Sequence, residues 1–424
     1  MKDEVSENYL LRELCRTPSF ILSASSFPIV PLAVPFWNGA TYRAILRTIV
    51  SGAVIDGRDL GALKSALLDQ IGMADAVLCG SGRLALELAL RACGVGNNDE
   101  VIIPSFCCSA VVAPILALGA LPVLADVGAE LNLTVETVDA AITGKTKAIV
   151  VPHLFGNPAD ISAIVQLARE KNIRVVDDAA QALGATVDGR TVGSFGDAGI
   201  ISFGNEKVCF GLGGGAVVSN QPGLVDAENL RPAQLAPIFE KLAAAQFHWR
   251  WRRWTLPVQP VLSWGKRAAP DAPPAPYEKT AMANLQASVA LSLMQTLGEN
   301  IASRRARVRG YQELLGGEDR LELIPHGSGS GCLTQVVRVL PESRGVDLAS
   351  KLVEILGKWG YEVQGSYVPI HLISGFEKCV WDRLPYAASV WAHLIELPCE
   401  PTVSLSHVEQ ISTLVKKLVR AHAA

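Results

Sequence analysis

Three short stretches of this sequence combine residue types that can do chemistry, and each follows an apolar run. The first, Gly80-Ser81-Gly82, follows the run Ala76–Cys79 and precedes a helical pattern. Small residues before a helix let its backbone N–H groups and its dipole hold a phosphate. Glycine before a helix is also common, so this stretch alone does not separate a phosphate site from an ordinary helix start.

The second stretch is Asp177-Asp178, after the apolar run Ile173–Val176. Buried acids are costly unless paired, so these two indicate either a helix N-cap or a cationic cofactor partner. The third holds Lys207, between an apolar strand pattern and a glycine-rich loop. Such a lysine is either solvated on the surface or desolvated, with a lowered pKa, and then suited to Schiff-base chemistry.

A phosphate cradle, an acid and a lysine are the three groups that pyridoxal phosphate (PLP) requires. The lysine binds the cofactor covalently, the acid keeps the pyridine nitrogen protonated, and the helix end takes the phosphate. The three stretches together therefore predict a PLP site.

Around these residues, short apolar runs alternate with helical patterns. This alternation predicts βαβ units and a mostly parallel sheet, and the continuous apolar runs predict that both sheet faces are covered. Ligands bind such sheets at the carboxyl ends of strands, where the three stretches lie. The expected strands are 76–79, 101–103, 122–124, 148–151, 173–176, 198–203 and 216–218, and the expected helices are 83–92, 110–118 and 160–170.

The pattern changes after about residue 220. Residues 265–277 are rich in Pro and Ala and predict a linker, and 281–315 predict a long helical stretch. The expected division is an N-terminal segment 1–48, a large cofactor-binding domain 49–265, and a region 266–424. That last region would hold the linker, the long helix and a smaller α+β domain.

Several ordered motifs resemble the DegT-type family of PLP-dependent aminotransferases, which make amino sugars on nucleotide sugars. The resemblance runs from about residue 49 to the C-terminus, and its motifs include GSGRLALELAL, DEVIIPSF, VVPHLFGNPADI, VVDDAAQALGA, GSFGDAGIISFGNEK and GGGAVVSN. It implies the α/β fold-type-I architecture, with a large seven-stranded, mainly parallel domain and a smaller C-terminal α+β domain. It also implies a homodimer with active sites at the subunit interface.

The resemblance also assigns roles to single residues. Lys207 corresponds to the catalytic lysine, Asp178 to the partner of the pyridine nitrogen, and Gln181 to a contact on the side of the phenolic oxygen. The phosphate contacts correspond to Ser81, Gly82, Arg83 and Ser202. His153 lies in the motif PHLFG, where a structural histidine at a strand end is favoured over a functional one.

The sequence departs from the family pattern around the expected cofactor. Arg83 stands where the family commonly has Thr, so its guanidinium either binds the phosphate or points away. Cys108 stands where the family offers a stacking aromatic, so Phe106 is expected to stack instead. Gly213 replaces a family Glu. Lys279 lies where the family's Asn reaches the partner subunit's cofactor, and this leaves that contact undecided between the two subunits.

Residues 247–264 (FHWRWRRWTLPVQPVLSW) hold four of the eight tryptophans of the chain, with three arginines interleaved. One interpretation is a contact with a membrane surface or a lipid-linked or anionic substrate, and another is a nucleic-acid stacking surface. The alternative is a short helix that packs its Trp face while the arginines extend to solvent. Because the net charge is −3, no nucleic-acid partner is expected.

Composition limits the classes of protein to which this chain could belong. A hydrophobic share of 49% supports a large folded core. The nine cysteines contain no CxxC pair, so no metal site is expected. The first residues carry charges of both signs without an apolar signal core, which predicts a cytoplasmic protein.

The expected activity is transamination from an amino-acid donor, usually glutamate in the family, to a keto sugar. The sugar is expected to be nucleotide-linked, with a related biosynthetic keto intermediate as the substitute. Lys207 would act as general base and acid. One alternative is PLP-dependent sugar dehydration, for which relatives carry His at the lysine position. The other is a non-catalytic or membrane-associated regulatory protein on the same scaffold.

Overall fold

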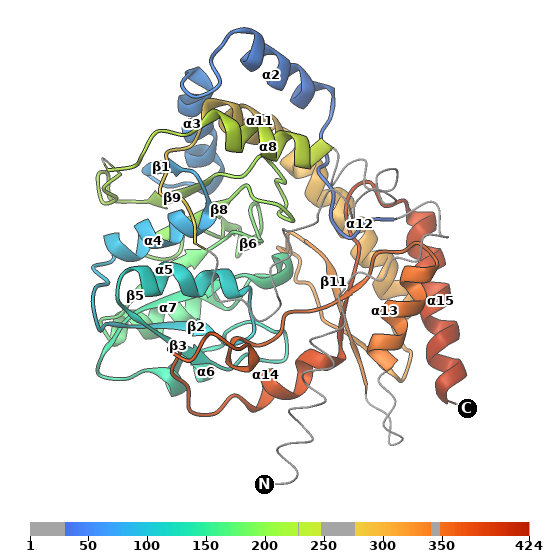
Figure 1. The fold of residues 1–424 in the computed structure, drawn as a ribbon. Helices are drawn as coiled ribbons and strands as arrows, with labels where there is room; N and C mark the ends of the chain where they lie inside the picture. The colour runs from blue at the N-terminus through green and yellow to red at the C-terminus, as the bar shows by residue number, and fades with distance from the viewer. Residues whose placement is uncertain (1–29, 228, 247–275, 341–347, 424) are drawn as a thin grey trace.

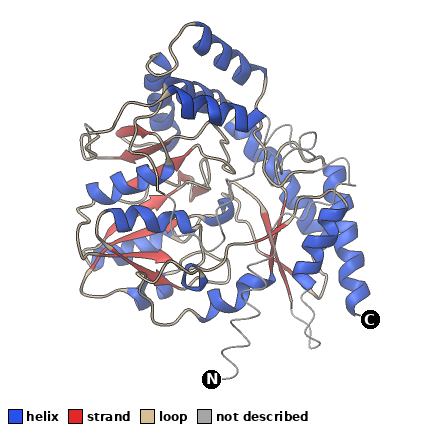
Figure 2. Cartoon of the chain, viewed as in Figure 1, coloured by secondary structure: helices blue, strands red, loops and turns tan. Residues whose placement is uncertain are grey.

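The computed structural model describes residues 30–227, 229–246, 276–340 and 348–423, and its larger body is built on a seven-stranded sheet (Figures 1 and 2). In spatial order the strands are β1 (Asp75–Cys79), β9 (Gly215–Ser219), β8 (Ala198–Ser202), β5 (Arg174–Asp178), β4 (Thr146–Pro152), β2 (Glu100–Pro104) and β3 (Leu121–Ala125). Strand β9 is antiparallel to both neighbours, and the other pairings of this sheet are parallel. The predicted large, mainly parallel sheet is confirmed.

Helices cover both faces of this sheet, as the continuous apolar strands predict. Val150 of β4 packs in one apolar cluster with Leu88, whereas the preceding residue of the strand, Ile149, packs in another with Ile164. Successive side chains of a strand point to opposite faces, so both faces of β4 are buried. The covering helices are α3 (Arg58–Ile71), α4 (Gly82–Ala92), α5 (Val112–Ala117), α6 (Val135–Ala141), α7 (Ile161–Glu170) and α11 (Asn284–Met294).

A smaller C-terminal body combines helices and strands, as predicted, and it holds a four-stranded antiparallel sheet. Its strands in spatial order are β10 (Leu321–Leu323), β11 (Gln335–Val339), β13 (Leu394–Leu397) and β12 (Gln364–Gly365). The helices around it are α12 (Leu297–Leu315), α13 (Leu348–Lys358), α14 (Pro385–Val390) and α15 (Leu405–Ala423). Helix α12 joins the two bodies, because Leu297 packs in the core of the large one and Tyr311 in the core of the small one.

The structure differs from the sequence expectations in several local details. The helical stretch expected at 281–315 is two helices, α11 and α12, separated at residues 295–296. The helix expected at 110–118 begins with a 3-10 turn (Ser109–Val111), and α5 is short. Asp177 and Asp178 are the last residues of β5 instead of following it.

Two further helices lie beside the large body. Helix α2 (Gly39–Val50) contains the expected boundary at residue 48 and packs on α3 and α11, where Thr48 Oγ1 donates to Ser288 Oγ at 3.1 Å. Helix α8 (Leu235–Ala243) precedes the Trp/Arg-rich stretch 247–264, which lies outside the described residues.

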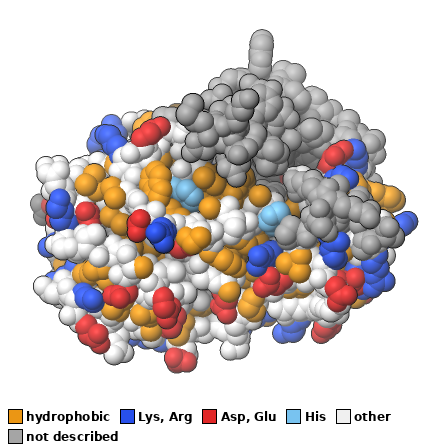
Figure 3. Space-filling model, turned by 90° about the horizontal axis from the view of Figure 1, so that it is seen from below, with side chains coloured by type: hydrophobic (Ala, Val, Ile, Leu, Met, Phe, Trp, Pro, Cys, Tyr) orange, Lys and Arg blue, Asp and Glu red, His pale blue; other side chains and the backbone are white. Residues whose placement is uncertain are grey.

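The described surface carries charges of both signs. Basic and acidic side chains are interspersed on the face shown in Figure 3. Among the described residues, no helix combines the length and apolar character that crossing a bilayer requires. The same residues contain no cluster of three His, Cys, Asp or Glu side chains suited to a metal ion.

Candidate active site

A cavity of about 310 Å³ lies at the carboxyl ends of β4, β5 and β8, beside the first turn of α4. Seven of the eight residues that the sequence predicts for the cofactor site line this cavity: Ser81, Gly82, Arg83, Asp178, Gln181, Ser202 and Lys207. The parallel sheet brings them together because the carboxyl ends of its strands meet at one edge.

The first turn of α4 forms one end of the cavity. Ser81 caps the helix, and its Oγ accepts a hydrogen bond from the Leu84 amide at 3.2 Å. Gly82 lies against Ser202, where a Cβ atom would come within 2.8 Å of the Ser202 hydroxyl. Glycine is therefore required for the helix start to approach β8 closely. The hydroxyl of Ser202 and the helix N-terminus together suit a phosphate.

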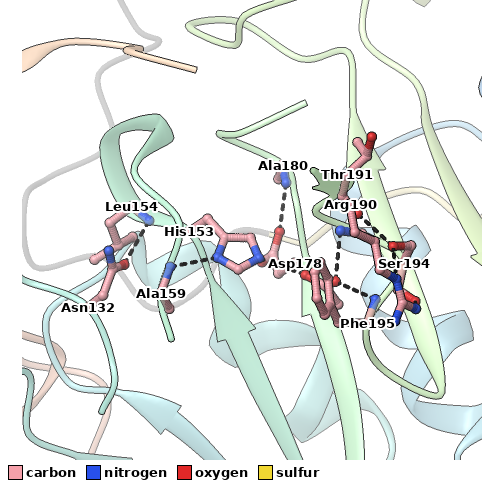
Figure 4. Close-up of polar contacts among 12 residues, drawn as sticks. Asn132, His153, Leu154, Ala159, Asp178, Ala180, Arg190, Thr191, Ser194 and Phe195 are labelled. Atoms are coloured by element: carbon pink, nitrogen blue, oxygen red, sulfur yellow. Dashed lines mark hydrogen bonds and ion pairs between the residues drawn. The ribbon is translucent and has the colours of Figure 1, made fainter. Parts of the chain in front are cut away.

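Strand β5 presents two carboxyls with different surroundings, of which Figure 4 labels Asp178 beside the Ala180 amide. Asp177 is fully engaged: its Oδ1 lies 2.7 Å from His153 Nε2, and its Oδ2 accepts from the amides of Gly193 and Phe195 at 2.8 and 2.9 Å. Asp178 lines the cavity, and its Oδ1 accepts from the Ala180 amide at 2.9 Å. Among the described residues, Oδ2 of Asp178 has no hydrogen-bond partner.

Burial raises the pKa of Asp178, while the nearby positive charge of Lys207 lowers it by a smaller amount. A buried carboxyl with one unpartnered oxygen is stabilised by a cationic N–H group. The protonated pyridine nitrogen of PLP has this chemistry, so the donor set of the cavity fits the cofactor. Asp178, and not Asp177, is placed for this contact.

His153 also lines the cavity, but both ring nitrogens are occupied. Its Nδ1 accepts a hydrogen bond from the Ala159 amide at 3.0 Å, so Nε2 carries the proton that is donated to Asp177. The imidazole and the Asp177 carboxyl are both completely buried. This geometry agrees with the structural interpretation of His153, because neither nitrogen is available for proton transfer.

Lys207 lies in the loop that follows β8, and it is half-buried at the cavity wall. The preceding residue, Glu206, has a φ of 60°, a left-handed conformation that is uncommon for a residue with a side chain. Backbone strain of this kind clusters at functional sites.

Gln181 is held at the cavity by contacts on both sides of its amide. Its Oε1 accepts from the Phe155 amide at 3.0 Å, and its Nε2 donates to the Tyr367 hydroxyl at 3.2 Å. Burial raises the pKa of Tyr367 well above its usual value, so this hydroxyl stays protonated. Tyr367 comes from the small body, and the sequence analysis did not find it. The motif YVPIHL, in which it lies, was the available signal.

The structure does not place Phe106 in the cavity, contrary to the expectation that it stacks on the cofactor. Its ring is completely buried between Phe155 and Tyr367, at centroid distances of 6.3 and 6.0 Å. Cys107 and Cys108 form this part of the cavity wall instead. The aromatic side chain points into the core because its strand end is covered by the small body.

Two further cations lie near the site, and the expected contact of Lys279 with the partner subunit's cofactor stays a prediction. Lys279 forms an ion pair with the buried Glu87 at 2.6 Å and does not line the cavity. Lys241 of α8 does line it, although no sequence motif marked this residue.

Comparison with known proteins identifies the family to which the chain belongs. Residues 39–416 match the model of the DegT/DnrJ/EryC1/StrS aminotransferase family. The chain belongs to this family. It is a PLP-dependent aminotransferase.

Similar proteins agree with this assignment. GDP-perosamine synthase of Caulobacter vibrioides is 27% identical over 390 residues, which cover 91% of this chain and 97% of that protein. A UDP-N-acetyl-3-dehydro-alpha-D-glucosamine 3-aminotransferase of Acidithiobacillus ferrooxidans is 44% identical over 197 residues, covering 46% of this chain and 53% of that one. The crystal structure of the aminotransferase TlmJ from Streptoalloteichus hindustanus superimposes with a TM-score of 0.74 at 25% identity, covering 94% and 100% of the two chains.

Proposed function

We propose that this aminotransferase moves an amino group from an amino-acid donor, glutamate, to the keto group of a nucleotide-linked sugar. The arrangement of Asp178 and Lys207 in one cavity carries the transamination part of this proposal. The sugar acceptor is supported by the names of two similar proteins, a GDP-perosamine synthase and a UDP-linked sugar 3-aminotransferase.

Each residue of the site would have a separate role in this amino transfer. Bound PLP supplies an electron sink next to the reacting carbon. Asp178 would keep the pyridine nitrogen protonated, and Gln181, which Tyr367 fixes in place, would contact the side of the phenolic oxygen. The Nζ atom of Lys207 would serve as the general base and acid that takes the proton from the donor's α-carbon and returns it.

The experiment that tests this function follows the visible absorbance of the PLP-loaded protein. Excess L-glutamate should remove the band as the amino group is transferred, and a keto sugar linked to UDP or GDP should restore it. L-glutamine and an unlinked keto intermediate are the comparison donor and acceptor. A band that no amino donor changes would overturn the proposal. The matched Lys207→Ala variant should fold but form no lysine-linked band.

Sugar dehydration is the second enzymatic candidate, and the presence of Lys207 in place of His disfavours it. The same experiment separates the two activities. Loss of a hydroxyl from a nucleotide deoxysugar, without uptake of nitrogen from glutamate, would support dehydration instead.

We also infer that the protein works as a homodimer in the cytoplasm. Leu46 and Val50 of α2 are 63% and 78% exposed, and Leu235 of α8 is 50% exposed. Apolar side chains clustered on the surface are typical of a subunit interface. Light scattering should give twice the mass of one chain, and a monomer would contradict the inference.

A membrane or lipid-linked contact through 247–264 stays a separate proposal, tested by co-sedimentation with anionic vesicles.

A further inference from the structure

Besides Lys207, two cationic side chains from different elements line the cofactor cavity. Arg83 lies in the first turn of α4, next to Gly82 and near Ser202, and Lys241 comes from α8. The positive charge of Arg83 is close enough to act on the ammonium of Lys241. Like charges that share a cavity repel one another unless an anion lies between them.

Gly213 provides the space for Lys241. This glycine has a φ of +79°, which favours glycine, and a Cβ atom there would come within 3.1 Å of Lys241 Nζ. A side chain at position 213 would therefore displace the ammonium group. The missing side chain at Gly213 therefore leaves room for the Lys241 ammonium group in the cavity.

The ammonium of Lys241 has no hydrogen bond or ion pair with the described residues. Lys241 as a whole is exposed to solvent, yet desolvation of its ammonium group lowers the pKa of Lys241. The charge of Glu278 opposes this effect, and Arg83 adds to it. A cation in these surroundings is stabilised when an anionic ligand binds beside it.

Arg83 lines the same cavity, and its guanidinium also contacts an aromatic ring outside the cavity lining. Its guanidinium carbon lies 5.3 Å from the centre of the Tyr277 ring, a cation–π distance. The ring is fixed because the Tyr277 hydroxyl donates to Glu87 at 2.7 Å. Glu87 also binds Lys279, so Lys279 is directed away from the cavity while Arg83 and Lys241 remain in it.

We propose that Lys241 and Arg83 together bind a phosphate group in this cavity, beside the start of α4 and Ser202. The proposal rests on the aminotransferase function, and it adds Lys241 to the phosphate contacts that the resemblance already implies, pairing it with Arg83. The phosphate belongs either to the cofactor or to a nucleotide-linked substrate, and both sources require the same paired cations.

The test compares the wild type with Lys241→Gln, Arg83→Gln and the matched control Lys64→Gln, which removes a half-buried lysine that Asp75 binds at 2.7 Å outside the cavity. In the first arm, the dissociation constants of PLP and of pyridoxal, which lacks the phosphate, are measured by absorbance titration. Lys241→Gln and Arg83→Gln should each weaken PLP binding about tenfold or more and leave pyridoxal binding unchanged. Lys64→Gln should change neither.

The second arm measures UDP and GDP binding to the PLP-saturated proteins by calorimetry. Weaker nucleotide binding in Lys241→Gln, with an unchanged preference for PLP over pyridoxal, would assign the cations to the substrate phosphate and still support the site. Lys241→Arg keeps the charge and should keep the preference, which separates loss of charge from a folding defect.

The proposal is overturned if the ratio of the PLP and pyridoxal constants and both nucleotide affinities stay within about twofold of the wild type. Neither arm measures transfer of an amino group. A wild type that binds PLP but aminates no keto sugar would therefore refute the proposed acceptor and leave this test unaffected.

Discussion

Glu396 of β13 offers a direct test of how burial controls ionisation beside the active site. The residue is 7% exposed. Ser366 Oγ donates to its Oε1 at 3.0 Å, and Gln364 Nε2 donates to its Oε2 at 3.5 Å. Burial raises the pKa of Glu396 from 4.5 to about 7, and the negative charge of Glu206 contributes in the same direction.

The magnitude follows from that pKa. Each pKa unit corresponds to about 1.4 kcal/mol, so the ionised form of Glu396 destabilises the folded state by about 3 kcal/mol. Between pH 4.5 and pH 7 the folded chain binds the proton that the unfolded chain has released. The stability from this group is therefore fully present below about pH 4.5 and is lost as the pH rises toward 7.

The perturbation is Glu396→Gln, which keeps the shape and removes the charge. The free energy of unfolding is measured by urea denaturation at pH 5 and pH 8, at the same PLP loading for both proteins. The difference between variant and wild type should move in favour of the variant by about 2.5 kcal/mol from pH 5 to pH 8. Subtracting the wild type cancels the other titrating groups.

The matched control is Glu354→Gln on α13. That carboxyl is fully exposed, and the hydrogen bond from Lys358 lowers its pKa below 4.5, so it is ionised in both states across this pH range. Its difference from the wild type should stay nearly constant. A Glu396→Gln difference that is equally constant would refute the reasoning, because it would mean that Glu396 is already ionised at pH 5 in the folded protein.

Three further predictions concern the cavity. Asp178→Asn should weaken PLP binding and lower turnover by about a hundredfold or more, because an amide no longer stabilises the protonated ring nitrogen; near-normal kcat would show that another group serves it. Gly82→Ala should raise the PLP dissociation constant, since the new methyl group meets Ser202 at 2.8 Å, and an unchanged constant would contradict the close packing. His153→Phe should lower the free energy of unfolding by about 3 kcal/mol, because it leaves one oxygen of the buried Asp177 carboxyl unpaired; a loss below about 1 kcal/mol would show that water or the backbone replaces the imidazole.

Much of the fold was accessible from local sequence patterns. The apolar runs around Ile149 and Val176 predicted covered, mostly parallel strands because burial on both faces excludes polar alternation. Local sequence patterns also indicated which residues form the candidate active site. Lys207 and Asp178 each follow an apolar run, and strand ends in a parallel sheet converge, so their meeting in one cavity required no tertiary information.

Other properties depended on contacts between residues far apart in the chain. Local patterns alone left both adjacent aspartates open, and only the family resemblance chose Asp178, because strand side chains alternate and the register is set by neighbouring strands. It pointed Phe106 toward the cofactor, whereas the small body covers that strand end and buries the ring.

Contacts between distant residues also determine where the cationic side chains near the cavity lie. Within one chain, the buried carboxylate of Glu87 binds Lys279 outside the cavity, and its expected contact with the partner subunit's cofactor stays a prediction. Lys241 lies 28 residues along the chain from Gly213, and only the folding of α8 over that glycine brings its ammonium into the cavity. The sequence by itself determined the cofactor chemistry, because strand-end residues carry it. The tertiary structure decided which side chains surround that chemistry, because packing between distant segments sets where each charge can lie.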